Sequence, residues 1–127
     1  MKPNALLTIA SLLSILLMTL HVTDDIVRGL SPAAGENVGG VAIFVVWLFG
    51  TLALPERRSG YVIMLLGGLF AAAMPVLHMN GVRYPAIAKS DGGFFFVWTL
   101  LVVGTTGTFS VLLSAHALWL LRRGKPR

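Results

Sequence analysis

The chain contains no cysteine. This absence excludes disulfide bonds and thiolate metal sites. It also excludes the small four-helix thiol oxidoreductases that pass electrons from cysteine pairs to quinone, and the membrane proteins whose outer loops are held by disulfides. Any chemistry that this chain carries has to use nitrogen and oxygen groups.

Charged residues are the second shortage. They make up 12% of the 127 residues, while 56% are hydrophobic and the mean hydropathy is +0.83; soluble domains carry about twice that charged fraction. The net charge of +5 does not indicate nucleic acid, because the ten basic residues are scattered over segment ends without interleaved aromatic residues. The composition predicts one integral membrane domain, residues 1–127, whose partner is the lipid bilayer.

Four apolar stretches are about long enough to cross a bilayer, which takes roughly 20 helical residues. They cover approximately residues 4–22, 38–54, 61–79 and 94–121. The first begins like a secretory signal, but no small-residue cleavage site follows it promptly, so we interpret it as a retained span. A tight turn joins the second and third stretches. The pattern predicts an all-α fold, an integral membrane four-helix antiparallel bundle.

The basic residues predict that both the N and C termini are cytoplasmic. In that orientation the outer side carries only Arg28, Arg83 and Lys89. The other seven basic residues are on the inner side: Lys2, Arg57, Arg58, Arg122, Arg123, Lys125 and Arg127. This asymmetry follows the positive-inside rule. We expect a multi-pass protein of the bacterial inner (plasma) membrane, either as a homo-oligomer or within a larger membrane complex.

No Asp, Glu, Lys or Arg lies in the middle of any predicted span. Because intramembrane charges mark ion and proton pathways, their absence argues against the small drug–proton antiporters that depend on a carboxylate in the first helix. The polar residues within the spans are mainly Ser, Thr and Gly. One stripe of small residues, formed by Thr106, Ser110 and Ser114, predicts a helix–helix contact.

Two histidines are predicted to lie at one depth. His21 comes 17 residues after Asn4, and His78 comes 17 residues after Tyr61. At 1.5 Å of rise per residue, both are roughly 25 Å from the inner boundary. The third histidine, His116, lies toward the other end of the last span, and we interpret it as an interfacial or packing residue.

Helical spacing predicts which way these histidines face. His21, Asp25 and Arg28 fall on one stripe if the first helix continues past residue 22. In the third span, small residues at Gly67 and Ala71 lead along one face to His78, and such residues mark the face on which a neighbour packs. The two histidines are therefore expected to converge at the outer ends of the first and third helices.

The residues around these histidines match nitrogen and oxygen ligation of a divalent metal. The predicted metal ligands are His21, Asp25 and His78. A wider set for a small polar ligand adds Asp24, Arg28 and Arg83, with Asp91 in support.

Two alternatives to a metal or polar-ligand site stay open. One is haem, held between the two histidines as axial ligands in an electron-transfer protein. The other has no site: Asp24 or Asp25 pairs with Arg28, Thr23 caps a short interfacial helix, and the histidines lie among lipid headgroups. The chain would then be a structural or accessory subunit of a larger membrane complex. No catalytic motif is present, so the sequence leaves open whether the protein is an enzyme.

Overall fold

Helices make up all the regular secondary structure of the described chain. The computed structural model describes residues 3–30 and 38–124. Within those ranges it contains α1 (Pro3–Val27), α2 (Val38–Ala53), α3 (Arg58–Met79), α4 (Tyr84–Ala88) and α5 (Gly93–Arg122), and no strand. The all-α prediction is therefore confirmed. By length and composition α1, α3 and α5 can each cross a membrane, whereas α2 is a shorter apolar helix of 16 residues.

Two helical segments differ from the prediction. The first is α1, which continues beyond residue 22 and ends in a Schellman motif. Gly29 there has φ +67°, its N–H donates to the carbonyl of Ile26 (3.0 Å), and the N–H of Leu30 donates to the carbonyl of Asp25 (2.9 Å). The second is the five-residue helix α4, which lies within a segment expected to be a loop and has a proline in its first turn.

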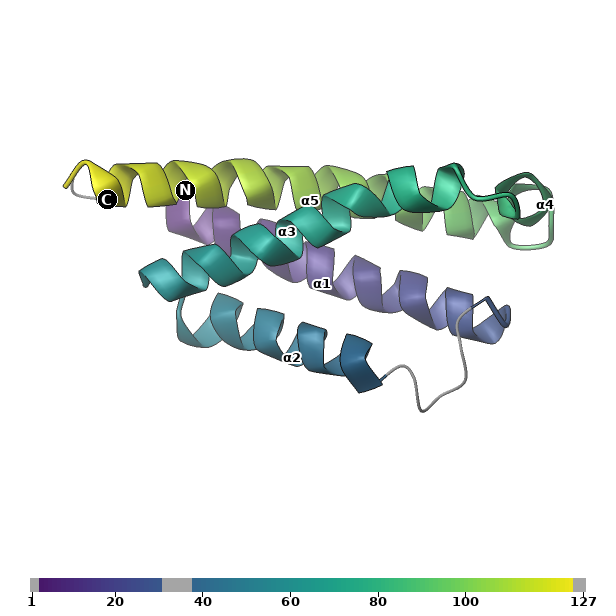
Figure 1. The fold of residues 1–127 in the computed structure, drawn as a ribbon, viewed down its shortest axis with the longest axis horizontal. Helices are drawn as coiled ribbons and strands as arrows, with labels where there is room; N and C mark the ends of the chain where they lie inside the picture. Colours follow the sequence, from purple (N-terminus) through teal and green to yellow (C-terminus); the bar gives the residue numbers. More distant parts are fainter. Residues whose placement is uncertain (1–2, 31–37, 125–127) are drawn as a thin grey trace.

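The four longer helices lie lengthwise beside one another, and α4 is at one end of the molecule (Figure 1). The most extensive contact is between α3 and α5, and α1 also packs on α5. The backbones of α3 and α5 approach closely at Gly107, where a Cβ would lie 2.7 Å from the Cβ of Ala71. Ser110 is wholly buried in this contact and donates a hydrogen bond to the carbonyl of Met64 (3.3 Å). Small residues on α5 thus form a helix–helix contact, as the sequence predicts.

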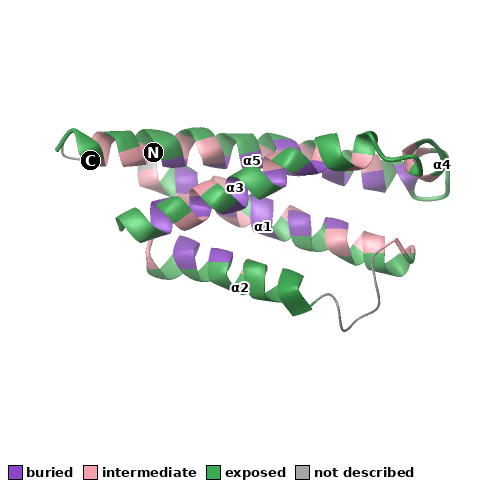
Figure 2. Ribbon diagram, in the orientation of Figure 1, coloured by how far each residue is buried: buried purple, intermediate pink, exposed green. Residues whose placement is uncertain are grey.

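The second helix packs against its neighbours mainly through its C-terminal half. Trp47 Nε1 donates to Ser11 Oγ on α1 (2.9 Å), and the hydroxyl groups of Ser11 and Thr51 are 2.8 Å apart. The indole ring of Trp47 lies against Gly67 of α3, at a position where any Cβ would collide with it. Most of the remaining length of α2 is exposed (Figure 2).

Much of the outside of the molecule is apolar, and several polar side chains are buried inside it. Large hydrophobic side chains, such as Leu16, Val45, Leu66 and Phe109, are exposed. The buried polar residues are Ser11, Ser14, His21, Thr51, Thr99, Ser110 and Ser114. An apolar exterior around small and polar interior residues is typical of helices that pack within lipid. Together with the three long apolar helices, this distribution indicates a membrane protein.

Candidate metal site

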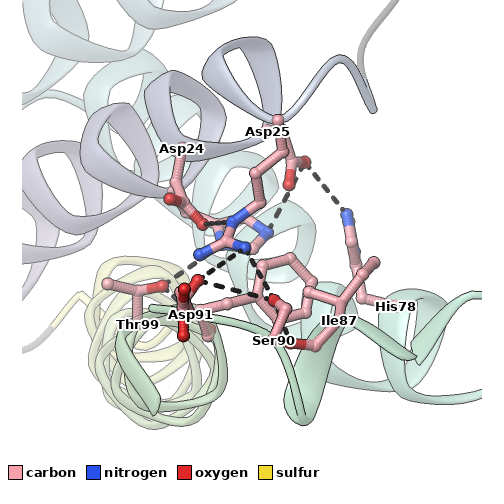
Figure 3. A network of polar contacts seen from close by, with 10 residues as sticks. Asp24, Asp25, His78, Ile87, Ser90, Asp91 and Thr99 are labelled. Atoms are coloured by element: carbon pink, nitrogen blue, oxygen red, sulfur yellow. Dashed lines mark hydrogen bonds and ion pairs between the residues drawn. The ribbon is translucent and has the colours of Figure 1, made fainter. Parts of the chain in front are cut away.

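A histidine–aspartate cluster (His21, Asp25 and His78) lies at the end of the molecule where α4 is found. His21 and Asp25 are one turn apart on α1, and His78 is in the last turn of α3. One carboxylate oxygen, Asp25 Oδ2, is 3.8 Å from His21 Nε2 and 3.3 Å from His78 Nε2. Figure 3 shows Asp25 and His78 facing each other across the gap between the two helices.

The extended α1 explains why Asp25 reaches this position. Residues four apart lie on the same face of a helix, so Asp25 projects beside His21 only because α1 stays helical as far as Val27. The Schellman motif at Gly29 then ends the helix directly after the cluster. On α3, the buried Met74 is one turn before His78 and continues the packed face that leads to it.

Hydrogen bonds to Nδ1 determine the tautomer of each histidine. The hydroxyl group of Thr99 donates to the carbonyl of Phe96 (3.0 Å), so it accepts a hydrogen bond from Nδ1–H of His21 (3.3 Å). In His78, Nδ1 is 3.1 Å from the carbonyl of Met74, and a carbonyl can only accept. Both rings therefore carry a proton on Nδ1. The Nε2 of His21 is left without a hydrogen bond, whereas the Nε2 of His78 faces an acceptor, Asp25 Oδ2 (3.3 Å), so it donates a proton there, and a metal ion would take the place of that proton.

The free nitrogen of His21 is enclosed within the protein. The His21 side chain is only 1% exposed. Neither its Nε2 nor Asp25 Oδ1 has a hydrogen-bond partner within the described ranges. Buried polar atoms are nearly always paired, so this pair of orphan atoms calls for a physical explanation. One divalent cation would satisfy both.

Two of the three separations between the ligand atoms are close to those around a tetrahedral ion. Ligand atoms about 2.05 Å from zinc are about 3.4 Å from one another, whereas cis ligands of an octahedral ion are about 3.0 Å apart. The 3.3 and 3.8 Å separations in the cluster are nearer to the tetrahedral value. One ligand atom from each residue can be chosen so that all three lie within 4.8 Å of one another. To surround one ion, any pair of ligand atoms as far apart as 4.8 Å would have to close to about 3.4 Å.

An aromatic ring forms one wall of the cluster. The ring centroid of Phe96, on α5, lies 5.2 Å from that of His21 and 6.1 Å from that of His78. Phe96 is almost fully buried. It therefore keeps water away from this side of the histidines and lowers the local dielectric, which strengthens electrostatic interactions with the carboxylate.

A cavity borders the cluster at Asp25, His78 and the edge of Phe96. It has a volume of about 280 Å³ and is lined by Asp25, Leu30, Leu77, His78, Gly81, Val82, Arg83, Tyr84, Ile87 and Phe96. Its wall is about half polar and half apolar, and Arg83 provides a positive charge. A metal ion held by three protein ligands keeps one position for water or another small ligand. Because the cavity touches Asp25 and His78, it offers room for that ligand.

Asp24 and Arg28 belong to a neighbouring ion pair and not to the cluster itself. Arg28 Nε donates to Asp24 Oδ2 at 2.7 Å. Its Nη1 donates to Ser90 Oγ (3.1 Å) and to the backbone carbonyl of Asp91 (3.3 Å), in the turn between α4 and α5 (Figure 3). Gly92 completes this turn: it has φ +74°, and a Cβ there would lie 2.8 Å from Arg28 Nη2. The pair ties the end of α1 to the start of α5.

The structure separates the predicted polar residues into three groups. His21, Asp25 and His78 come together, Asp24 pairs with Arg28, and Arg83 lines the cavity. The supporting contact from Asp91 comes from its backbone carbonyl. The expected capping role of Thr23 is wrong, because its hydroxyl donates to the carbonyl of Thr19 within α1 (2.7 Å). His116 is exposed and stacks on Trp119, with ring centroids 5.9 Å apart.

Thr99 and Phe96 are the site residues that the sequence did not indicate. Both lie on α5, and 78 positions separate Thr99 from His21. Ser and Thr are common throughout the spans, so no periodic pattern distinguishes Thr99 from the others. Its role depends on how α1 packs against α5.

Haem does not fit this arrangement. Axial ligation would place the two Nε2 atoms on opposite sides of a porphyrin, with the iron between them. In the structure the two rings meet edge to face, with centroids 4.9 Å apart and an angle of 77° between the planes. Both Nε2 atoms also face the same oxygen of Asp25, which leaves no slot for a macrocycle.

Comparison with protein-family models, with curated proteins and with solved structures found no significant match. Function has to be inferred from the chemistry of the cluster.

Proposed function

We propose that this protein spans the membrane four times and binds one divalent metal ion, zinc being the best fit, through His21 Nε2, His78 Nε2 and the Asp25 carboxylate. The observation that carries the proposal is the buried Nε2 of His21, which has no hydrogen-bond partner in the described chain and lies 3.8 Å from Asp25 Oδ2. Both histidines also use Nδ1 to bind an oxygen atom, Thr99 Oγ1 for His21 and the Met74 carbonyl for His78. This second hydrogen bond is typical of metal-ligating histidines.

The membrane part of the proposal has both termini in the cytoplasm and the metal site at the outer boundary of a bacterial inner membrane. It is supported by the excess of basic residues at the ends of the chain and in the turn before α3. Three helices have the length of a span. The fourth, α2, extends roughly 24 Å at 1.5 Å per residue, and a bilayer adapts to such a short helix by local thinning.

The expected chemistry is binding of a small polar ligand at the remaining metal position. Zinc would polarise that ligand or lower the pKa of bound water. Leu30, Leu77 and Ile87 give the cavity apolar walls, and Arg83 is placed to attract an anionic group. The chain's own contribution is to orient both imidazoles through Thr99 and Met74 and to exclude water on the Phe96 side.

The test is metal content and affinity in protein purified with a tag that contains no histidine. Wild-type protein should retain about one zinc per chain after desalting, as measured by elemental analysis. Replacing His78 with Gln removes a ligand, so zinc affinity should fall by more than the roughly 10–100-fold that loss of a supporting hydrogen bond costs. Replacing His116 with Gln is the matched control, because His116 is exposed and remote in sequence from the cluster.

Two outcomes would contradict the metal site. One is equal zinc retention by the His78→Gln variant and the wild-type protein. The other is an equal loss of zinc in the His78→Gln and His116→Gln variants. If wild-type protein binds neither zinc nor iron(II), manganese or nickel, the accessory-subunit alternative takes its place. That alternative is supported by α2, whose apolar residues Val41, Val45 and Phe49 are exposed and available to a second copy or a larger membrane complex.

A further inference from the structure

A second pocket lies at the end of the molecule opposite the histidine–aspartate cluster. It is formed where α3 begins and α5 ends, and its volume is about 180 Å³. Its lining residues are Arg58 and Val62 from α3, with Leu118, Leu121 and Arg122 from α5. Two cationic side chains from different helices thus share one small pocket with three aliphatic ones.

Both arginines are available to a ligand. Arg58 and Arg122 are exposed, and neither side chain has a hydrogen-bond or ion-pair partner within residues 3–30 and 38–124. Other arginines of the chain are engaged: Arg28 pairs with Asp24, and the guanidinium carbon of Arg123 lies 4.0 Å from the ring centroid of Trp119. Two neighbouring guanidinium groups without a carboxylate repel each other, so an anion between them is favourable.

The rest of the pocket is apolar and continuous with the protein interior. Leu118 and Leu121 pack against a buried cluster formed by Leu7, Tyr61 and Met64. A fully hydrated anion such as free phosphate would gain nothing from these walls. An amphipathic anion would gain both the charge contact and the burial of its hydrocarbon part.

We propose that this pocket binds an anionic phospholipid, with the headgroup phosphate held between Arg58 and Arg122 and the first part of an acyl chain along Val62, Leu118 and Leu121. The guanidinium group matches phosphate oxygens with two parallel N–H donors. Basic pockets between membrane helices are suited to anionic headgroups. The proposal needs membrane insertion but does not depend on the metal site, since the two sites share no residue.

The test is native mass spectrometry of the full chain released from nanodiscs that contain phosphatidylglycerol and phosphatidylcholine. Wild-type protein should retain phosphatidylglycerol in preference. Because the double variant Arg58→Gln with Arg122→Gln loses the charge-assisted hydrogen bonds from both guanidinium groups to the phosphate, it should retain phosphatidylglycerol more than about tenfold less well. The matched control is Arg57→Gln with Arg123→Gln, which removes the same charge next to the pocket and should change retention little.

Three results would overturn the proposal. The first is wild-type protein that retains both lipids equally, and this result needs no variant to fold. The second is an equal loss in the two double variants, which would mean attraction by general surface charge. The third is displacement of the lipid by millimolar inorganic phosphate, together with binding of phosphate alone that is as tight as binding of the lipid. The pocket would then be a site for a free anion.

Discussion

At the scale of single residues, Thr99 decides which nitrogen of His21 is available. Its hydroxyl group already donates to the Phe96 carbonyl and can only accept from His21 Nδ1. Replacing Thr99 with Val keeps the shape but removes this acceptor, so His21 loses the partner that orients its ring. We expect zinc affinity, measured by competition with a chromogenic chelator, to fall roughly 10–100-fold while all three ligands remain.

The control for this change is Thr105, on the same helix. It is exposed, and its hydroxyl donates only to the carbonyl of Leu101 in its own helix (2.8 Å). Replacing Thr105 with Val should leave zinc affinity unchanged. If the Thr99 variant also kept wild-type affinity, Thr99 would not be what orients the ring of His21.

At the scale of helices, the contact between α3 and α5 depends on small residues. Ser110 is fully buried, and a Cβ added to Gly68 would lie 3.1 Å from the Cβ of Ser110. Replacing Ser110 with Leu should push the two helices apart and destabilise the fold by roughly 1–3 kcal/mol, as overpacking usually does. The measurement is the midpoint of thermal unfolding in detergent, followed by circular dichroism.

The neighbouring residue Phe109 provides the comparison, because it is exposed whereas Ser110 is buried. Replacing Phe109 with Leu should shift the midpoint much less than the Ser110 change. An unchanged midpoint in the Ser110 variant would show that α3 and α5 do not pack through this face.

Helical periodicity predicted the cluster but not its surroundings. The four-residue interval between His21 and Asp25 was enough to place them on one face, and the small residues before His78 showed which side of its helix is packed. The sequence left open whether Asp24 or Asp25 would pair with Arg28. That choice depends on the turn before α5, where Ser90 and the backbone of Asp91 hold the other end of Arg28. Contacts between helices distant in sequence leave no periodic signal.

At the scale of the whole molecule, the two ends differ in chemistry. The end with α4 holds the histidine–aspartate cluster, the ion pair of Asp24 with Arg28, and Arg83 in the wall of the cavity. The end where α3 begins and α5 finishes holds unpaired arginines around an apolar pocket. In the orientation inferred from the basic residues, the end with α4 would bind a polar ligand from outside the cell. The opposite end would bind a lipid of the cytoplasmic leaflet.

The orientation itself can be tested with single cysteines, since the native chain has none. Ser59, at the start of α3, and Ala86, in α4, are both exposed and lie at opposite ends of the molecule. With both termini in the cytoplasm, a cysteine at position 86 should react with a membrane-impermeant maleimide in intact cells. A cysteine at position 59 should react only after the cells are lysed, and this second reaction controls for accessibility of the thiol. The reverse pattern would place the histidine–aspartate cluster on the cytoplasmic side, and metal for it would then have to come from inside the cell.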